Sequence, residues 1–150
     1  MGGMGPLMTR LRLASAVLWL ALALPQPGRA ATVVAVDPGF APVASVLLGL
    51  FTDRTGHPMT LAVAPGAVLE QTTADVLLAP DADMPARLAE QGHAQADTLV
   101  TYATDPDAAV PRGAVLLRPG LGDPVARAFL AFLLSPEAWE VIVAHGFGAH

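Results

Sequence analysis

Two short glycine-containing loops hold the residue types that best suit this chain to bind a small ligand. Residues 37–40 and residues 64–67 each follow a run of β-favouring residues, and each places a glycine directly after a proline. Glycine permits sharp turns, and the amide groups that such turns expose bind small anions, above all where a helix begins. The candidate ligand-binding residues are therefore Asp37, Gly39, Phe40, Pro65, Gly66 and Ala67.

The first of these loops has two interpretations, which the sequence leaves open. In the structural interpretation, no ligand is bound and Asp37 caps the helix that follows. Pro38 and Pro42 then form turns, and Gly39 provides a flexible corner. In the ligand-binding interpretation, backbone amides of both loops donate hydrogen bonds to a small solute. Phe40 could stack on an organic ligand, but a single aromatic residue after a strand is more often part of the core.

The other residues that could support catalysis or metal binding are isolated from one another. The chain has no cysteine, which excludes a disulfide, a thiol nucleophile and a thiolate metal site. Beyond residue 30 there are two serines, Ser45 within an expected helix and Ser135 at a helix cap, so neither lies in a nucleophile elbow. The four histidines lack the spacing of metal ligands. We therefore expect no enzyme, no metal and no cofactor.

Residues 1–30 have the layout of a secretory signal peptide. Arg10 and Arg12 precede an apolar run over residues 13–24, and small residues up to Ala30 precede the expected cleavage site. The apolar run is shorter than the roughly 20 residues that a spanning helix needs. We expect the chain to be exported, with an uncleaved N-terminal anchor as the alternative.

The composition beyond residue 30 restricts the partners. Residues 31–150 carry thirteen acidic side chains against five arginines, a net charge of −8. Nucleic acids and anionic membranes are bound by basic surfaces, so we expect neither as a partner. The length of this part is that of one ordinary domain.

Strands and helices alternate along most of residues 31–150. The expected strands cover residues 32–36, 59–64, 74–79 and 98–103. The expected helices cover the apolar segment that ends at residue 55, a short turn over residues 67–71, and residues 84–91. This alternation predicts an α/β fold, with a mostly parallel sheet flanked by helices and right-handed crossovers.

The pattern changes at residues 104–113, which contain two prolines, two aspartates and a glycine without clear periodicity. We interpret them as a loop or linker. A short strand is expected over residues 114–117. Two helices follow, with Asp123 and Ser135 as their caps, because each is followed by a proline at the first helical position. The second helix is expected to stop at Gly146.

Three segments resemble the periplasmic solute-binding proteins of ABC transporters, most of all their molybdate-binding branch. They are the opening strand, loop and helix, which end in FTDRTGHPMTL; the segment ADVLLAPDADMPARLAEQG followed by TLVTYA; and the closing DPVARAFLAFLLSPEAWEVIVAHGF. They follow the family's order and cover most of residues 32–147. The resemblance implies a type 2 periplasmic-binding-protein fold, a periplasmic location, a small oxyanion such as molybdate or tungstate as ligand, and an ABC transporter permease as partner.

The chain departs from that family in two ways. The family inserts a second lobe after the strand that ends here in Tyr102-Ala103, whereas this chain has only the linker of residues 104–113. The resemblance therefore implies a single three-layer lobe over residues 31–150. The family also grips its anion with hydroxyls and amides, but neither loop here has a serine, the prolines have no N–H, and Asp37 adds a negative charge.

A second class of function is also open. Residues 43–51 are apolar on all sides of the expected helix, which is therefore either deeply buried or in contact with a partner. A single lobe could use such a surface in a homodimer or against a transporter, as an interaction module without a small ligand. A remnant without a selected function is the third interpretation. We expect the first class, an exported binding component of an ABC transporter without catalysis.

Overall fold

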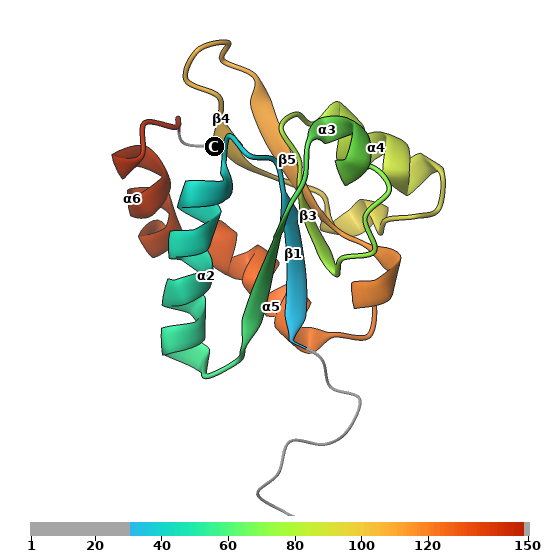
Figure 1. Ribbon diagram of the computed structural model, residues 1–150, viewed down its shortest axis with the longest axis horizontal. Helices are drawn as coiled ribbons and strands as arrows, with labels where there is room; N and C mark the ends of the chain where they lie inside the picture. Colours follow the sequence, from blue (N-terminus) through green and yellow to red (C-terminus); the bar gives the residue numbers. More distant parts are fainter. Residues whose placement is uncertain (1–30, 149–150) are drawn as a thin grey trace, which may run out of the picture. The chain divides into compact units, whose positions relative to one another are not determined.

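A five-stranded sheet forms the centre of residues 31–148, the part of the chain that the computed structural model describes (Figure 1). The predicted signal peptide lies outside the described residues. Within residues 31–148, no helix is long and apolar enough to cross a membrane. The strands are β1 (Thr32–Val36), β2 (Met59–Val63), β3 (Val76–Leu78), β4 (Val100–Thr104) and β5 (Pro111–Leu116), and their order in the sheet is β2-β1-β3-β5-β4.

The predicted mostly parallel sheet is confirmed, with β5 as the exception. β1 pairs in parallel with both β2 and β3, whereas β5 runs antiparallel between β3 and β4. The connection over residues 105–110 is too short for a crossover between parallel strands, which takes about a dozen residues or more. The bounds of the predicted linker are therefore corrected. Thr104 still belongs to β4, and β5 begins at Pro111, three residues before the predicted strand.

Helices cover both faces of the sheet, which gives three layers (Figure 1). One face carries α2 (Ala41–Thr55), α5 (Pro124–Leu133) and α6 (Pro136–Ala144), and the other carries α3 (Gly66–Leu69) and α4 (Asp83–Glu90). Two short 3-10 helices, η1 (Ala96–Thr98) and η2 (Arg118–Gly120), precede β4 and follow β5. The predicted single three-layer lobe is thus the observed architecture.

The alternation of side chains along the strands builds a separate core on each face. In β1, Val34 and Val36 pack among the residues of α2, α5 and α6, whereas Ala35 between them packs with those of α3 and α4. β3 repeats the pattern with Leu77 facing the second core. Because these strands are covered on both sides, they read as continuous apolar runs in the sequence.

The apolar helix α2 is explained by burial on one side. Its residues Val43, Leu47 and Phe51 are buried, and α2 packs against β2, α5 and α6. The opposite side exposes Ser45 and Val46, the latter to 41%. Of the two interpretations of this helix, deep burial of one face is therefore the observed one.

The predicted caps begin and end the C-terminal helices. Asp123 accepts a hydrogen bond from the Val125 amide (2.9 Å), and Ser135 accepts one from the Ala138 amide (3.3 Å). Gly146 follows α6 with φ of 90°, a left-handed conformation that glycine adopts without a steric cost. The two helices pack against α2 on the same face of the sheet.

Candidate functional site

The two predicted loops follow neighbouring parallel strands and leave the sheet at the same end. This end, where the carboxyl ends of β1 and β2 lie, is called the binding edge below. Val36 and Val63 are paired in register at the ends of β1 and β2, and the Ala64 amide donates to the Val36 carbonyl (3.0 Å). The chain also turns to β2 on one side of β1 and later to β3 on the other, so β1 lies at the topological switch point. Open α/β sheets bind their ligands at the carboxyl ends of strands at such a point.

An arginine that the sequence analysis did not select occupies this edge. Arg112, the second residue of β5, donates from Nη1 to Asp37 Oδ1 (2.9 Å) and from Nη2 to Asp37 Oδ2 (3.1 Å). The Arg112 side chain is 3% exposed and that of Asp37 12%. A buried guanidinium and a buried carboxylate therefore form a parallel, bidentate pair, the strongest geometry for these two groups.

This pair overturns the predicted role of Asp37 as a helix cap. Helix α2 begins after Phe40 and has no side-chain hydrogen bond at its N-terminal cap. The Asp37 carboxylate is engaged by Arg112, while its backbone carbonyl accepts a long hydrogen bond from the Phe40 amide (3.3 Å). The guanidinium gives the Asp37 carboxylate two charged hydrogen-bond donors, whereas the start of a helix would give it a neutral backbone amide. The pair with Arg112 is therefore the stronger interaction.

Two aromatic rings hold the guanidinium of Arg112. The Arg112 Cζ lies 5.3 Å from the ring centroids of both Phe40 and Phe147, within the range of a cation–π contact. Phe40 is fully buried, and its ring meets those of Tyr102 and Phe147 edge-on at 5.0 Å. Phe40 is thus a core residue that supports Arg112, and its ring is not available to stack on a ligand.

Tyr102 completes the buried surroundings of the pair. Its hydroxyl donates to the Ala79 carbonyl, which follows β3 (2.9 Å). Burial raises the pKa of the Tyr102 hydroxyl well above its ordinary value, while Arg112 lowers this pKa and Asp37 raises it by smaller amounts. The neutral hydroxyl therefore acts as a fixed donor that joins β4 to the end of β3.

Gly39 passes close to the ion pair. A Cβ atom built on Gly39 would lie 3.1 Å from Asp37 Oδ2 and 3.6 Å from Arg112 Nη2. The first distance is tighter than nine in ten Cβ contacts, so a side chain here would press on the carboxylate. The structure thus brings Asp37, Gly39 and Phe40 together around Arg112.

The second loop is more open to solvent than the first. Pro65 has an extended conformation before α3, and its carbonyl accepts hydrogen bonds from Val68 and Leu69. Gly66 and Ala67 form the first turn of α3, where amide groups have no partner within a helix. The assignment of Pro65, Gly66 and Ala67 as ligand-binding residues stays a prediction.

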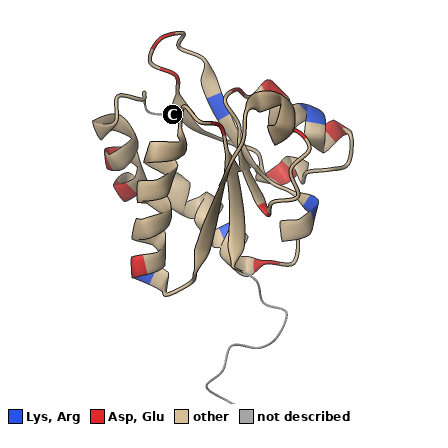
Figure 2. Ribbon diagram, viewed as in Figure 1, with Lys and Arg blue, Asp and Glu red and all other residues tan. Residues whose placement is uncertain are grey.

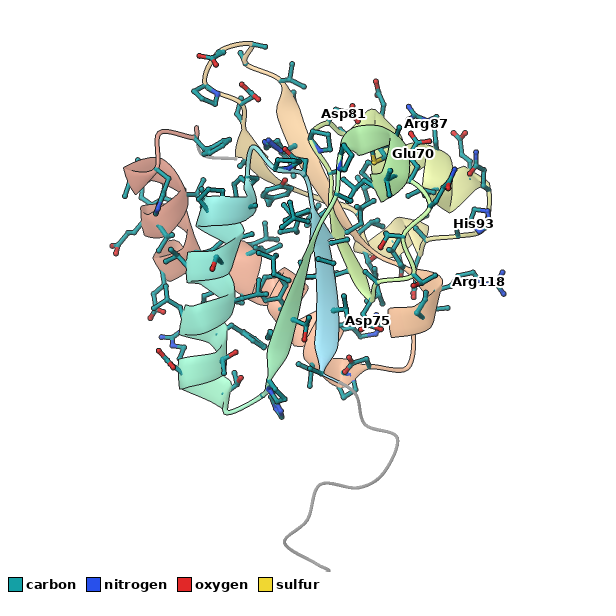
Figure 3. All side chains as sticks on the ribbon, viewed as in Figure 1. Glu70, Asp75, Asp81, Arg87, His93 and Arg118 are labelled. Carbon is teal, nitrogen blue, oxygen red and sulfur yellow. The ribbon has the colours of Figure 1, made fainter. Side chains whose placement is uncertain are left out.

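A hollow also lies on the α3–α4 side of the sheet. It has a volume of about 480 Å³, and its lining includes Glu70, His93 and Arg118 (Figure 3). Glu70 is already paired with Arg87 on the surface. Among residues 31–148, no group of three or more acidic or histidine side chains is placed to hold a metal ion.

Acidic residues outnumber basic ones in the described part of the chain (Figure 2). They lie in helices and loops, and none of the five strands contains one. Arg112 is unusual among the five arginines of residues 31–150, because the other four are exposed. Among the described residues, the buried cation is therefore the one at the predicted binding edge.

Comparison with known proteins identifies one curated relative. No protein-family model matches the sequence. The chain is 34% identical over 120 residues to the molybdate-binding protein ModA of Rhodobacter capsulatus, a match that covers 71% of this chain and 48% of the relative. The chain thus spans about half the length of the curated relative that it matches.

Two solved structures share the fold. The periplasmic molybdate-binding protein of Azotobacter vinelandii superposes with a TM-score of 0.71 at 14% identity, over 79% of this chain and 99% of that one. The substrate-binding domain of a putative molybdenum ABC transporter from Clostridium difficile gives a TM-score of 0.72 at 7% identity, over 80% and 99%. The predicted resemblance to the molybdate-binding branch of the periplasmic binding proteins is confirmed, and these relatives are named as binding proteins.

Proposed function

We propose that this chain, which resembles the molybdate-binding branch of the periplasmic binding proteins, is an exported substrate-binding component of an ABC transporter. Its ligand is a small tetrahedral oxyanion such as molybdate or tungstate. Its location is the periplasm, and its partner is the permease of the transporter. The observation that carries this proposal is the 34% identity to a protein named for molybdate binding.

The geometry of the sheet supports an anion site at the edge where β1 and β2 end. The loops over residues 37–40 and 64–67 lie at the carboxyl ends of paired strands. The α2 helix, of fifteen residues, begins directly after the first loop, and its first turn includes amides without an intrahelical acceptor. Such a helix end carries a partial positive charge that favours an anion.

The site differs from a two-lobed clamp in its exposure. β4 and β5 are joined by residues 105–110 alone, so no second lobe is inserted between them. The exposed Val63 and Val68 flank the second loop at this edge, at 51% and 56% exposure. An anion at the edge would keep part of its hydration, and we therefore expect weaker binding than a closed cleft provides.

A thermal-shift titration of the purified protein tests the proposal. Molybdate, tungstate, sulfate and phosphate are compared with chloride at equal ionic strength, because a general salt effect would act in all five. A specific ligand stabilises the folded chain by mass action, by about 2.7 kcal/mol at a hundredfold excess over Kd. Equal melting temperatures in all five salts would contradict the oxyanion proposal.

A further inference from the structure

We infer that the Asp37 carboxylate is an internal substitute for the oxyanion, and that Arg112 binds the substrate once this carboxylate is displaced. The inference rests on the proposed function and adds a residue and a condition to it. The residue is Arg112, which the fold brings to the binding edge from β5. The condition is that substrate and Asp37 compete for one guanidinium.

The position of the pair supports the competition. Asp37 directly follows β1 at the switch point, where the ligand of an open α/β sheet is expected. Its two oxygens accept the two parallel hydrogen bonds of Arg112, at 2.9 and 3.1 Å. Two oxygens of a tetrahedral oxyanion match the same pair of donors, since the guanidinium binds carboxylates and phosphates in the same bidentate manner.

Arg112 is held in place, whereas Asp37 is attached to a loop. β5 is hydrogen-bonded to β3 on one side and to β4 on the other, and the rings of Phe40 and Phe147 lie beside the guanidinium. Asp37 is the more exposed partner, at 12% against 3% for the side chains. The carboxylate is therefore the group that gives way to an anion arriving from solvent.

One donor of Arg112, its Nε–H group, is not used by the Asp37 carboxylate. Within the described residues, the buried Arg112 Nε has no hydrogen-bond partner. A buried donor without a partner is unfavourable, and most such groups in proteins are satisfied. The Asp37 carboxylate has two oxygens, and both are engaged. The pair with Asp37 therefore leaves one buried donor of Arg112 unsatisfied.

Binding measurements on matched variants test the inference. Calorimetric titrations with sodium molybdate and with sodium sulfate are made on the parent protein, Asp37→Asn and Asp53→Asn. Asp37→Asn keeps the shape of the side chain and removes its charge, while Asp53→Asn removes the same charge from the exposed side of α2 near its C-terminal end. We expect Asp37→Asn to raise the affinity for at least one anion on the order of tenfold or more, because it removes a like charge from the site. Asp53→Asn should leave the affinity unchanged.

Two further variants test whether the gain in affinity depends on the charge at residue 37 and on Arg112. Asp37→Ser removes the charge with a shorter side chain, and serves if Asp37→Asn does not fold. In Asp37→Asn/Arg112→Gln, the gain in affinity should be lost. In the parent protein labelled with 15N, anion binding should shift the Arg112 Nε resonance, which a purely structural pair would leave unchanged.

The outcomes distinguish the inference from the proposed function. If the parent binds an oxyanion and neither Asp37 variant binds it more tightly, the inference is overturned and the proposed function stands. If the Asp37 variants bind an anion that the parent does not bind, the inference is supported and the proposed transport function is overturned. If no variant binds any anion, both are overturned.

Discussion

Arg112 and Asp37 join two strands of the sheet that are not neighbours. Their side chains form two hydrogen bonds of 2.9 and 3.1 Å, although β3 lies between β1, which precedes Asp37, and β5, which contains Arg112. The pair is buried and lies at the edge where the loops after β1 and β2 meet. The pair thus links the loop after β1 to β5 across the sheet, and it also lies at the centre of the candidate site.

Arg112→Met should destabilise the fold strongly. The substitution leaves the Asp37 carboxylate in a buried position without its cation, and breaking a buried pair in this way costs about 3–5 kcal/mol. The free energy of unfolding, measured by urea denaturation, reports the change. In Asp37→Asn/Arg112→Met, most of this loss should be recovered, because no buried charge is then left uncompensated.

Arg54→Met is the control for that variant. Arg54 is paired with Glu137 on the surface, where both side chains are about half exposed. Surface pairs contribute about 0–1 kcal/mol, so Arg54→Met should have little effect. Similar losses for Arg54→Met and Arg112→Met would show that burial of the Asp37 pair does not matter for stability.

Gly120→Ala and Gly49→Ala should change stability in opposite directions. A Cβ atom on Gly120 would lie 2.6 Å from the Asp75 carbonyl oxygen and 3.0 Å from Asp75 Cα, so backbone atoms would have to move. We expect a loss of about 1–3 kcal/mol from this overpacking. Gly49 is exposed within α2, with no atom within 4 Å of such a Cβ, so alanine should add about 0.5–1 kcal/mol. Thermal melts of both variants provide the comparison, and a loss for both would contradict the assigned packing at Gly49.

Tyr102 should make the folded chain lose stability in alkali. Its pKa is raised above the ordinary value of about 10, chiefly by burial, so the folded state holds the hydroxyl proton more tightly than the unfolded state. The contribution of this proton is fully present below pH of about 10 and is lost as the pH rises above that value. Urea unfolding followed over this range, together with the absorbance of tyrosinate, measures the effect, because the chain has a single tyrosine and no lysine.

Tyr102→Phe is the matched variant for the alkaline experiment. At neutral pH it should cost about 1–2 kcal/mol, because the buried Ala79 carbonyl loses its donor. Above pH of about 10 its stability should fall less than that of the parent. Parallel alkaline losses in both proteins would show that another group controls the transition.

Asp123→Ala should lower stability by about 1–2 kcal/mol through the loss of a helix cap. The carboxylate accepts from the Val125 amide at the start of α5 (2.9 Å) and from the Thr32 hydroxyl at the start of β1 (2.6 Å). Thr32→Val removes the second bond alone and should cause the smaller loss. Chemical denaturation of the two variants measures both, and an effect of Asp123→Ala below that of Thr32→Val would contradict the capping role.

Local patterns in the sequence were sufficient for most elements. The strands around Val34 and Leu77 are continuous apolar runs because both of their faces are covered, and the Asp123 and Ser135 caps are read from a polar residue before a proline. The pairing of β5 was not predictable in this way. Antiparallel placement between β3 and β4 depends on the length of a hairpin connection and on contacts far apart in sequence.

The candidate site was predicted only in part, for a physical reason. The loops at Gly39 and Gly66 were found because glycine after a strand has a local meaning. Arg112 was overlooked because it lay in a segment that resembled a linker, and its partner is 75 residues away. The available signal for Arg112 was a proline followed by arginine at the start of a β-favouring run. This pattern is a weak indication that the arginine lies on a strand.

By itself, the sequence determined most of the secondary structure, the α/β class, the excess of negative charge and the resemblance to molybdate-type binding proteins. These follow from local periodicity, composition and short motifs, which do not depend on the arrangement of distant segments. Only the tertiary structure decided the role of Asp37. A carboxylate after a strand can cap a helix or pair with a cation, and the choice depends on whether a cation is brought beside it. The position of β5 brings Arg112 there, so Asp37 forms a buried pair at the binding edge instead of a helix cap.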